Sequence, residues 1–255
     1  TTTGYKFVMS VMKKEPFGQR IIRDIKMSDA KLWFIKLYDD GYSYSTIASI
    51  RGVVKPAFQM AYTEDIIRRN PFEFRLDIIP NNTQKRVALS QKQQEQFLEF
   101  TKNDKHFCRY LDEIKILLGT GMRISELCGL TIADLDFDRR RIRVDHQLVR
   151  TQDGKRYIEK TKTECGCRYI PMSDEVYESF YNILSNRKKQ KKEIMIDGYA
   201  GFILLDKNGN PKVAMHVQKV VQRLCEKYNE ENIIPLPHIT PHVFRHTFCT
   251  NMANA

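Results

Sequence analysis

Three short stretches of this 255-residue sequence carry side chains that could act on a phosphate group. The first is Thr-Gly-Met-Arg-Ile-Ser-Glu-Leu at residues 120–127, which is typical of a helix end, a glycine turn and a second helix start. The turn would place the guanidinium of Arg123 beside the free backbone N–H groups of the second helix. A planar guanidinium and a helix N-terminus both favour an anion with two available oxygens, so this stretch predicts a phosphate site.

The second stretch is Ile-Thr-Pro-His-Val-Phe-Arg-His at residues 239–246. Thr240 fits the N-cap position of a helix and Pro241 its first helical position. Residues three and four apart share one face of a helix. The side chains on that face are His242, Arg245 and His246. They predict a polar ligand-binding face, although one of the histidines could instead satisfy a buried carbonyl group.

The third stretch, residues 157–168, fits a turn between two strands and carries Lys160 and Lys162 near its tip. A flexible ammonium group there could donate a proton to a leaving oxygen. Each stretch alone also has a purely structural reading, as a helix C-cap, a buried histidine or surface lysines. All three together, in this order along the chain, favour a site for phosphoryl transfer.

The first eighty residues should form the helical element that precedes these motifs. Apolar residues recur at spacings of three and four in residues 28–41 and 44–61, and Asn70-Pro71 interrupts the helical pattern. Residues 80–88 are polar and unpatterned, which is typical of a linker between domains. We therefore expect a domain over residues 1–80 and a second one over residues 81–255.

The second domain should hold all three motifs on a mixed framework. A capped helix is expected over residues 91–100, with further helices over residues 110–118, 174–184 and 213–228. From residue 139 the apolar period changes to two, Asp153-Gly154 supplies a hairpin turn, and residues 168–171 would add a third strand. The predicted fold class is mainly α with one small antiparallel β-sheet.

The net charge of +11 and the sequence pI near 9.3 suggest a polyanionic partner. Residues 1–80 hold 13 Lys+Arg and 9 Asp+Glu, and the remainder holds 29 and 22, so both domains are basic. This distribution fits a protein that grips double-stranded DNA with both domains, although a generally basic surface would explain it too.

Six dispersed cysteines and the lack of a secretory segment predict reduced thiols and a cytoplasmic protein. Only one residue separates Cys165 from Cys167, which does not fit a zinc site, so we expect no metal and no cofactor. No stretch approaches the roughly 20 apolar residues that a membrane span needs.

The two arginine motifs with a hairpin lysine between them resemble the tyrosine recombinase family, which includes phage integrases and Xer recombinases. The resemblance covers nearly the whole chain and looks most like the integrases of conjugative transposons. It implies a helical, SAM-like core-binding domain over residues 1–80 and a mixed α/β catalytic domain of the DNA breaking-rejoining fold over residues 81–255. The two domains would form a C-shaped clamp on DNA.

The resemblance also implies roles for individual residues. Arg123 and Arg245 would bind the non-bridging oxygens of the scissile phosphate, and His242 would assist by hydrogen bonding or proton transfer. Lys162 would be the general acid, preferred to Lys160 because Lys-Thr-x-x-x-x-Arg-x-Ile-Pro at residues 162–171 matches the family's hairpin. Two further residues would support the site: Glu126 and His246.

The implied reaction is integration and excision of a mobile element through a 3′-phosphotyrosine, with no need for a metal or ATP. The complete protein would act as a homodimer on each DNA site and as a homotetramer in the synapse. In the family the nucleophilic tyrosine follows the second arginine, whereas the last tyrosine here is Tyr228. We therefore expect this chain to be truncated before its nucleophile and not to cleave DNA alone.

Two other readings compete with a recombinase. A non-cleaving DNA-binding regulator could keep the recombinase fold without the tyrosine. It would not need Arg123, Lys162, His242 and Arg245 together. A type IB topoisomerase uses similar chemistry, but its longer architecture fits this two-domain layout less well.

Overall fold

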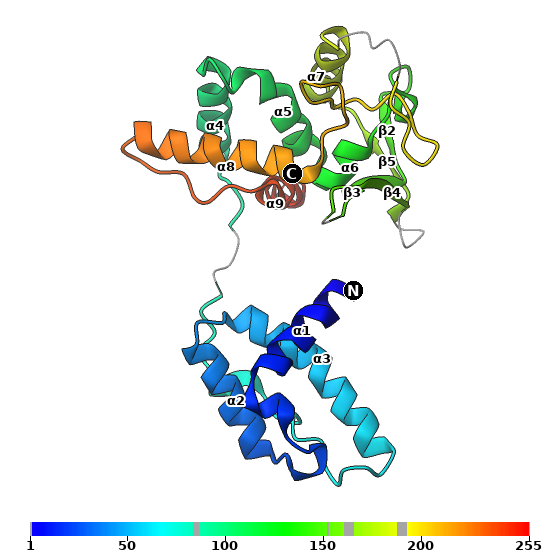
Figure 1. The fold of residues 1–255 in the computed structure, drawn as a ribbon. Coiled ribbons are helices and arrows are strands. Elements are labelled where there is room, and N and C mark those ends of the chain that lie inside the picture. The colour runs from blue at the N-terminus through cyan, green and yellow to red at the C-terminus, as the bar shows by residue number, and fades with distance from the viewer. Residues whose placement is uncertain (1, 84–86, 152, 161–165, 188–192, 255) are drawn as a thin grey trace. The chain divides into compact units, whose positions relative to one another are not determined.

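The computed structural model describes residues 2–83, 87–151, 153–160, 166–187 and 193–254 (Figure 1). The α-helices are α1 (Thr2–Lys14), α2 (Met27–Asp39), α3 (Tyr44–Thr63), α4 (Gln91–Asn103), α5 (Leu111–Thr120), α6 (Ile124–Gly129), α7 (Asp174–Ser185), α8 (Ala214–Glu231) and α9 (Pro241–Asn254). The strands are β1 (Leu135–Asp136), β2 (Arg141–Val144), β3 (His146–Arg150), β4 (Arg156–Lys160) and β5 (Arg168–Pro171).

The chain divides into two compact units, Thr1–Lys85 and Arg86–Ala255, each with its own hydrophobic core. In the first unit, α2 and α3 bury a cluster of aromatic rings. The rings of Phe17 and Trp33 stack with their centroids 4.4 Å apart, and Phe72 meets Phe58 edge-on at 4.9 Å. This unit is entirely helical in the residues described, apart from its turns and connections.

The core of the second unit joins α4, α5, α8 and α9 to the strands. Phe97 of α4 and Phe244 of α9 are fully buried, with ring centroids 5.9 Å apart. The predicted helix over residues 91–100 is confirmed as α4, whose N-cap Ser90 forms a capping box with Gln93. Thr247 of α9 accepts a hydrogen bond from the backbone N–H of Leu89 at 3.0 Å, which ties the last helix to the start of the unit.

The predicted mainly helical class with antiparallel strands is confirmed, but the strands form two small sheets instead of one. The first sheet has the order β1-β2-β5, and β3 pairs separately with β4. The expected first strand is divided at Asp145, whose carboxylate contacts Arg143 of β2 and His146 of β3. β2 and β3 therefore belong to different sheets although one residue separates them.

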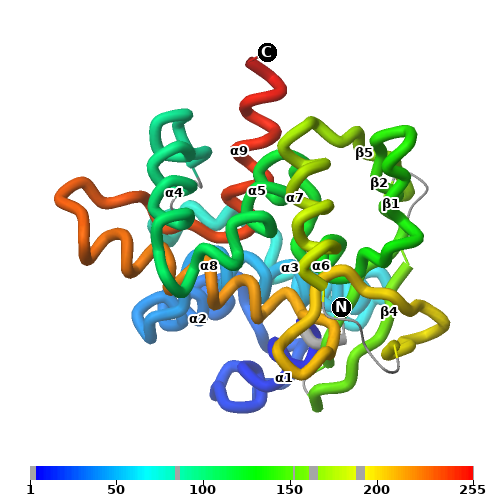
Figure 2. Tube along the Cα trace, turned by 90° about the horizontal axis from the view of Figure 1, so that it is seen from above, coloured from blue at the N-terminus to red at the C-terminus, as the bar shows by residue number. Residues whose placement is uncertain are grey.

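A tight turn at Gly121 connects α5 to α6. Gly121 has φ +58°, in the left-handed region that favours glycine, and it caps the C-terminus of α5. A Cβ atom at this position would overlap the ring of Phe248 in α9. Figures 1 and 2 both show α9 beside α5, so the turn between α5 and α6 is where the chain's last helix packs.

Within the part of the chain that the structure describes, every helix is too short or too polar to cross a lipid bilayer.

Replacing Gly121 with alanine tests this packing. Gly121→Ala should lower the free energy of unfolding by about 2–4 kcal/mol, because backbone strain and an overlap with Phe248 add together. Gly198→Ala is the matched control, because Gly198 also has a positive φ, +85°, but nothing within 4 Å of its Cβ position. It should cost only about 1 kcal/mol. Urea unfolding followed by circular dichroism measures both, and equal losses would contradict the packing.

Candidate active site

Arg123 is the N-cap residue of α6, as the sequence predicted. Its backbone is extended, with φ −71° and ψ 145°, and its side chain is half exposed. The backbone N–H of Arg123 donates to Glu126 Oε2 at 2.8 Å, and its guanidinium donates to Glu126 Oε1 at 2.8 Å. The arginine is therefore held by a carboxylate of the helix that it caps, while half of its side chain faces solvent.

Glu126 is buried and holds a second arginine. Arg168, at the start of β5, donates from Nη2 to Glu126 Oε2 at 2.7 Å and from Nη1 to Oε1 at 3.2 Å. Burial alone would raise the pKa of Glu126, but the bonds from Arg168 and Arg123 outweigh it and hold the pKa below its usual value. Glu126 is therefore an ionised carboxylate at neutral pH.

Arg245 of α9 lies on the turn that carries Arg123. Its Nη1 donates to the backbone carbonyl of Gly121 at 2.7 Å, across 124 residues of sequence. Because Gly121 is two residues before Arg123, this bond brings the second arginine to the same turn as the first. Two guanidiniums at one helix start favour an anion with two oxygens to offer.

The histidines of α9 lie on its outer side. His242 and His246 are exposed, Arg245 is half-buried, and Val243, Phe244 and Thr247 are buried. The exposed and buried residues alternate as expected for a helix with one face on the core. His242 and His246 thus lie on the same helix as Arg245, within the first two turns of α9.

The lysines of the predicted hairpin are described in part. Lys160 is the last residue of β4 and is exposed. Lys162 lies outside the described residues. The structure thus brings Arg123, Glu126 and Arg245 together at one turn and places Lys160 at the end of the strand that leads to residue 162.

Two residues that bond to α6 were not assigned a role from the sequence. Arg168 stood in the hairpin pattern, but nothing in the pattern identified Glu126 as its partner. Gln147 of β3 accepts a hydrogen bond from Ser125 of α6 at 2.7 Å and donates to Glu159 of β4 at 2.7 Å. No sequence signal distinguished Gln147 from any other polar strand residue.

A mostly buried polar cluster links α6 to β3. The ligand-type atoms of Asp134, Asp145 and His146 lie within 4.8 Å of one another, a grouping that could suit a metal ion. These atoms are already bonded: His146 contacts the carbonyl of Gly129 at 2.8 Å and Asp145 at 2.5 Å, and Arg143 donates to Asp134 at 2.9 Å. The cluster therefore acts as a structural link between helix and strand.

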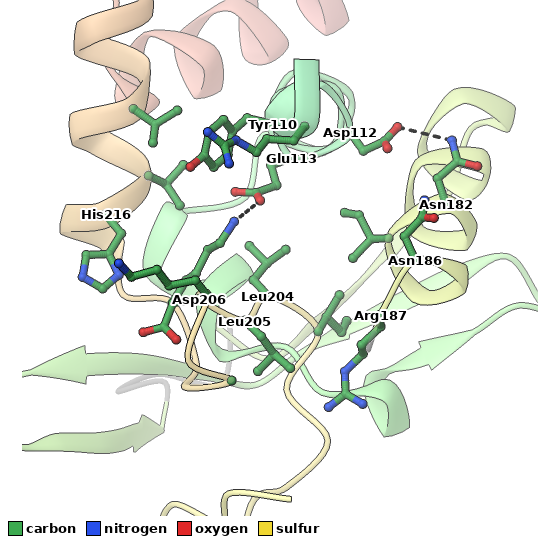
Figure 3. A pocket seen from close by; sticks show the side chains of 18 of the residues that line it. Tyr110, Asp112, Glu113, Asn182, Asn186, Arg187, Leu204, Leu205, Asp206 and His216 are labelled. Carbon is green, nitrogen blue, oxygen red and sulfur yellow. Dashed lines mark hydrogen bonds and ion pairs between the residues drawn. The ribbon is translucent and has the colours of Figure 1, made fainter. Parts of the chain in front are cut away.

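A separate pocket of about 1300 Å³ lies between α5, α7, α8 and the loop over residues 203–212 (Figure 3). Its buried Glu113 pairs with Lys212, and burial raises the pKa of Glu113 against the opposing effect of that lysine. Of the predicted site residues that the structure describes, none lines this pocket. This pocket and the arginine turn are therefore different places.

Comparison of this sequence with known proteins identifies a matching family model and several relatives. Residues 88–255 match the model of the phage integrase family. A transposase from transposon Tn916 of Enterococcus faecalis is 45% identical over 256 residues, which cover 100% of this chain and 63% of the transposase. A tyrosine recombinase XerC of Bacillus pumilus is 25% identical over 234 residues, which cover 91% of this chain and 69% of XerC. This chain therefore spans 63% of the length of the Tn916 transposase.

Among solved structures, one of the Tn1549 transposon integrase in complex with a circular intermediate DNA is similar to this chain. The TM-score is 0.95 at 44% identity, and the match covers 99% of this chain and 80% of that one.

The charge on Glu126 makes a prediction for stability. Glu126→Gln should lower the free energy of unfolding by about 3 kcal/mol at pH 7, because two arginines lose a buried charged partner. The pKa of Glu126 is lowered on folding, so its contribution is complete above the unfolded value of 4.5 and is lost as the pH falls through the folded value. The difference between the two proteins should therefore shrink in acid.

Urea unfolding at several pH values measures this difference. Asp174→Asn is the control, because Asp174 is 84% exposed in its pair with Arg140 and should change stability by less than about 1 kcal/mol. A difference between wild type and Glu126→Gln that stays constant from pH 7 to pH 3 would contradict the assigned ionisation.

Proposed function

Because this chain belongs to the phage integrase family, we propose that it is the DNA-binding and phosphate-activating part of a site-specific recombinase that integrates and excises a mobile element. The substrate is double-stranded DNA at the element's ends and at its target sites. The 45% identity to a Tn916 transposase and the likeness to a Tn1549 integrase bound to DNA support this proposal. The net charge of +11 suits a polyanionic substrate.

We assign a different function to each of the two domains. Residues 1–80 form the core-binding domain and residues 81–255 the catalytic domain. The division of the chain into two units with separate cores supports this assignment, as does a family match that begins at residue 88. Both domains carry an excess of basic residues, so each contributes to the grip on DNA.

The two arginines stabilise the transition state of phosphoryl transfer. Charge develops on the non-bridging oxygens as a fifth oxygen approaches phosphorus, and fixed guanidiniums neutralise it there. The observation that carries the proposal is the 2.7 Å bond from Arg245 to the Gly121 carbonyl, which holds the second arginine at the turn of the first. The half-exposed side chain of Arg123 leaves a guanidinium that DNA can approach.

The remaining side chains complete the chemistry. A tyrosine oxygen attacks phosphorus, the bond to the 5′-oxygen breaks, and that oxygen takes a proton from Lys162, with Lys160 as the alternative donor. His242 assists by hydrogen bonding to the phosphate or by taking the proton that the tyrosine hydroxyl loses, and Glu126 and His246 support the arginines. The 3′-phosphotyrosine keeps the bond energy for rejoining, so the reaction needs no ATP. The two guanidiniums neutralise the developing charge, so the reaction needs no metal ion.

Of the tyrosines in this chain, the one nearest in sequence to the second arginine motif does not suit the nucleophile's role. Tyr228, the last of them, is buried in α8 with its ring packed edge-on against Phe100 at 5.1 Å. We therefore assign to these 255 residues DNA binding and phosphate activation without cleavage. The active protein works in the cytoplasm, as a homodimer on each site and a homotetramer in the synapse.

A non-cleaving regulator with the recombinase fold is the second candidate. The buried position of Tyr228 favours it, because a regulator needs no nucleophile. The regulator hypothesis gives no reason for two arginines at the start of α6.

Arg245→Ala tests the proposed chemistry. It should slow formation of a covalent protein–DNA adduct by about 100- to 1000-fold, because one charge-stabilising donor is lost. DNA affinity should change only a few-fold, since one phosphate contact among many is removed. The measurement is a nicked suicide-substrate assay on a denaturing gel, run on this chain and on the full product of its gene.

The control is Arg109→Ala, because Arg109 also donates to a backbone carbonyl, that of His106 at 2.8 Å, but lines the separate pocket. It should leave the adduct rate unchanged. Tight binding to a verified site, with no adduct from the full gene product, would support the regulator instead.

A further inference from the structure

Two strands of the second unit are tied to neighbouring residues of α6. β4 is tied through Glu159, whose Oε2 accepts from Gln147, and Gln147 in turn accepts from Ser125 at 2.7 Å. Gln147 and Glu159 are also partners across the β3–β4 ladder, so the side-chain bond repeats the backbone register. The link therefore reaches from the first turn of α6 across two strands.

β5 is tied to α6 through Arg168, which forms an ion pair with Glu126, the residue that follows Ser125. The two Arg168 bonds, at 2.7 and 3.2 Å, are bidentate, and the side chain of Arg168 is only 28% exposed. Glu126 receives two more bonds from Arg123, one from the backbone N–H and one from the guanidinium. A carboxylate accepts about four hydrogen bonds, so these four donors saturate it.

The close approach of α6 to β3 leaves little room for adjustment. A Cβ atom on Gly129, at the end of α6, would lie 2.8 Å from the backbone nitrogen of Leu148 in β3. The helix is thus held at its end by backbone packing and at its start by Ser125 and Glu126. Since Arg123 caps that start, the bonds of Gln147 and Arg168 control where its guanidinium stands.

We propose that Arg168 and Gln147 are positioning residues, which hold the start of α6, and with it the Arg123 guanidinium, in place against β4 and β5. This inference rests on the proposed function, because it concerns the same phosphate site. Neither residue needs to touch DNA. Both act through α6: Arg168 through the Glu126 carboxylate and Gln147 through the Ser125 hydroxyl. β4 and β5 flank residues 161–165, which include the proposed general acid Lys162.

Arg168 has a second effect, on the charge of Glu126. The charged groups that act on Glu126 are Arg123 from the start of α6 and Arg168 from β5, and they oppose the burial that would raise its pKa. Without Arg168, burial should prevail and Glu126 should take up a proton at a higher pH. A protonated Glu126 would hold Arg123 less firmly, so cleavage should weaken in mild acid.

The experiment measures the single-turnover rate of adduct formation by the full gene product at saturating suicide substrate, from pH 5 to pH 9. Arg168→Ala should be about 100-fold slower at neutral pH, as expected when a reacting group is misplaced by about 1 Å. The ratio of its rate to the wild-type rate should also fall further toward pH 5. Arg168→Lys should recover part of the rate and the wild-type pH profile, because it keeps the charge but not the bidentate bond.

Gln147→Met should slow adduct formation with a wild-type pH profile, because it breaks the link to Ser125 without touching Glu126. Arg187→Ala is the matched control, because Arg187 is a mostly buried arginine that bonds Glu193 at 2.8 Å and the carbonyl of Phe202 at 3.2 Å, away from α6. It should lower the melting temperature but leave the adduct rate unchanged. If Arg168→Ala does not fold, Arg168→Gln takes its place, since it also lacks the charge.

An Arg168 variant with the rate and pH profile of Arg187→Ala would overturn the inference and leave the proposed function standing. A Gln147→Met protein with the wild-type rate of adduct formation would show that Gln147 is not a positioning residue. Absence of an adduct from the wild-type gene product, on a DNA site that it binds, would overturn the proposed function and the inference with it.

Discussion

The buried carboxylate of Glu126 is the interaction on which the arrangement of the second unit depends. It accepts from the backbone N–H of Arg123, from the Arg123 guanidinium and twice from Arg168. An ionised carboxylate out of water is unfavourable unless it is paired and fully hydrogen-bonded, so the two arginines are held to it. The Glu126 carboxylate therefore fixes the start of α6, the start of β5 and the half-exposed side chain of Arg123.

The second constraint is the turn at Gly121, which only a residue without a Cβ can form against Phe248. That close approach lets Arg245 reach the Gly121 carbonyl. The helix packing and the arginine contact thus depend on the same few atoms. Together, Glu126 and Gly121 bring residues from the middle and the end of the sequence to one turn.

Local signals in the sequence predicted the elements of this site, and long-range contacts decided how they meet. The glycine turn before Arg123 and the Thr240-Pro241 pair are local, so both helix starts were predicted, and the resemblance to the integrase family is confirmed. The bond from Arg245 spans 124 residues and that from Arg168 spans 42, and no periodicity reports such pairs. The division of the strands at Asp145 was missed because β2 pairs with β5 and β3 with β4, and the sequence pattern does not show which strands pair.

Arg123 and Arg245 are proposed to bind the same phosphate of the DNA. The most direct test replaces single phosphates of a bound DNA site with neutral methylphosphonates and measures the affinity of this chain, of Arg123→Ala and of Arg245→Ala for each. We expect one phosphate per site at which neutralisation weakens wild-type binding but weakens it less in either variant, since each variant has lost a partner of that charge. If the two variants reduce the effect of neutralisation at different phosphates, or at none, the two arginines do not bind one phosphate.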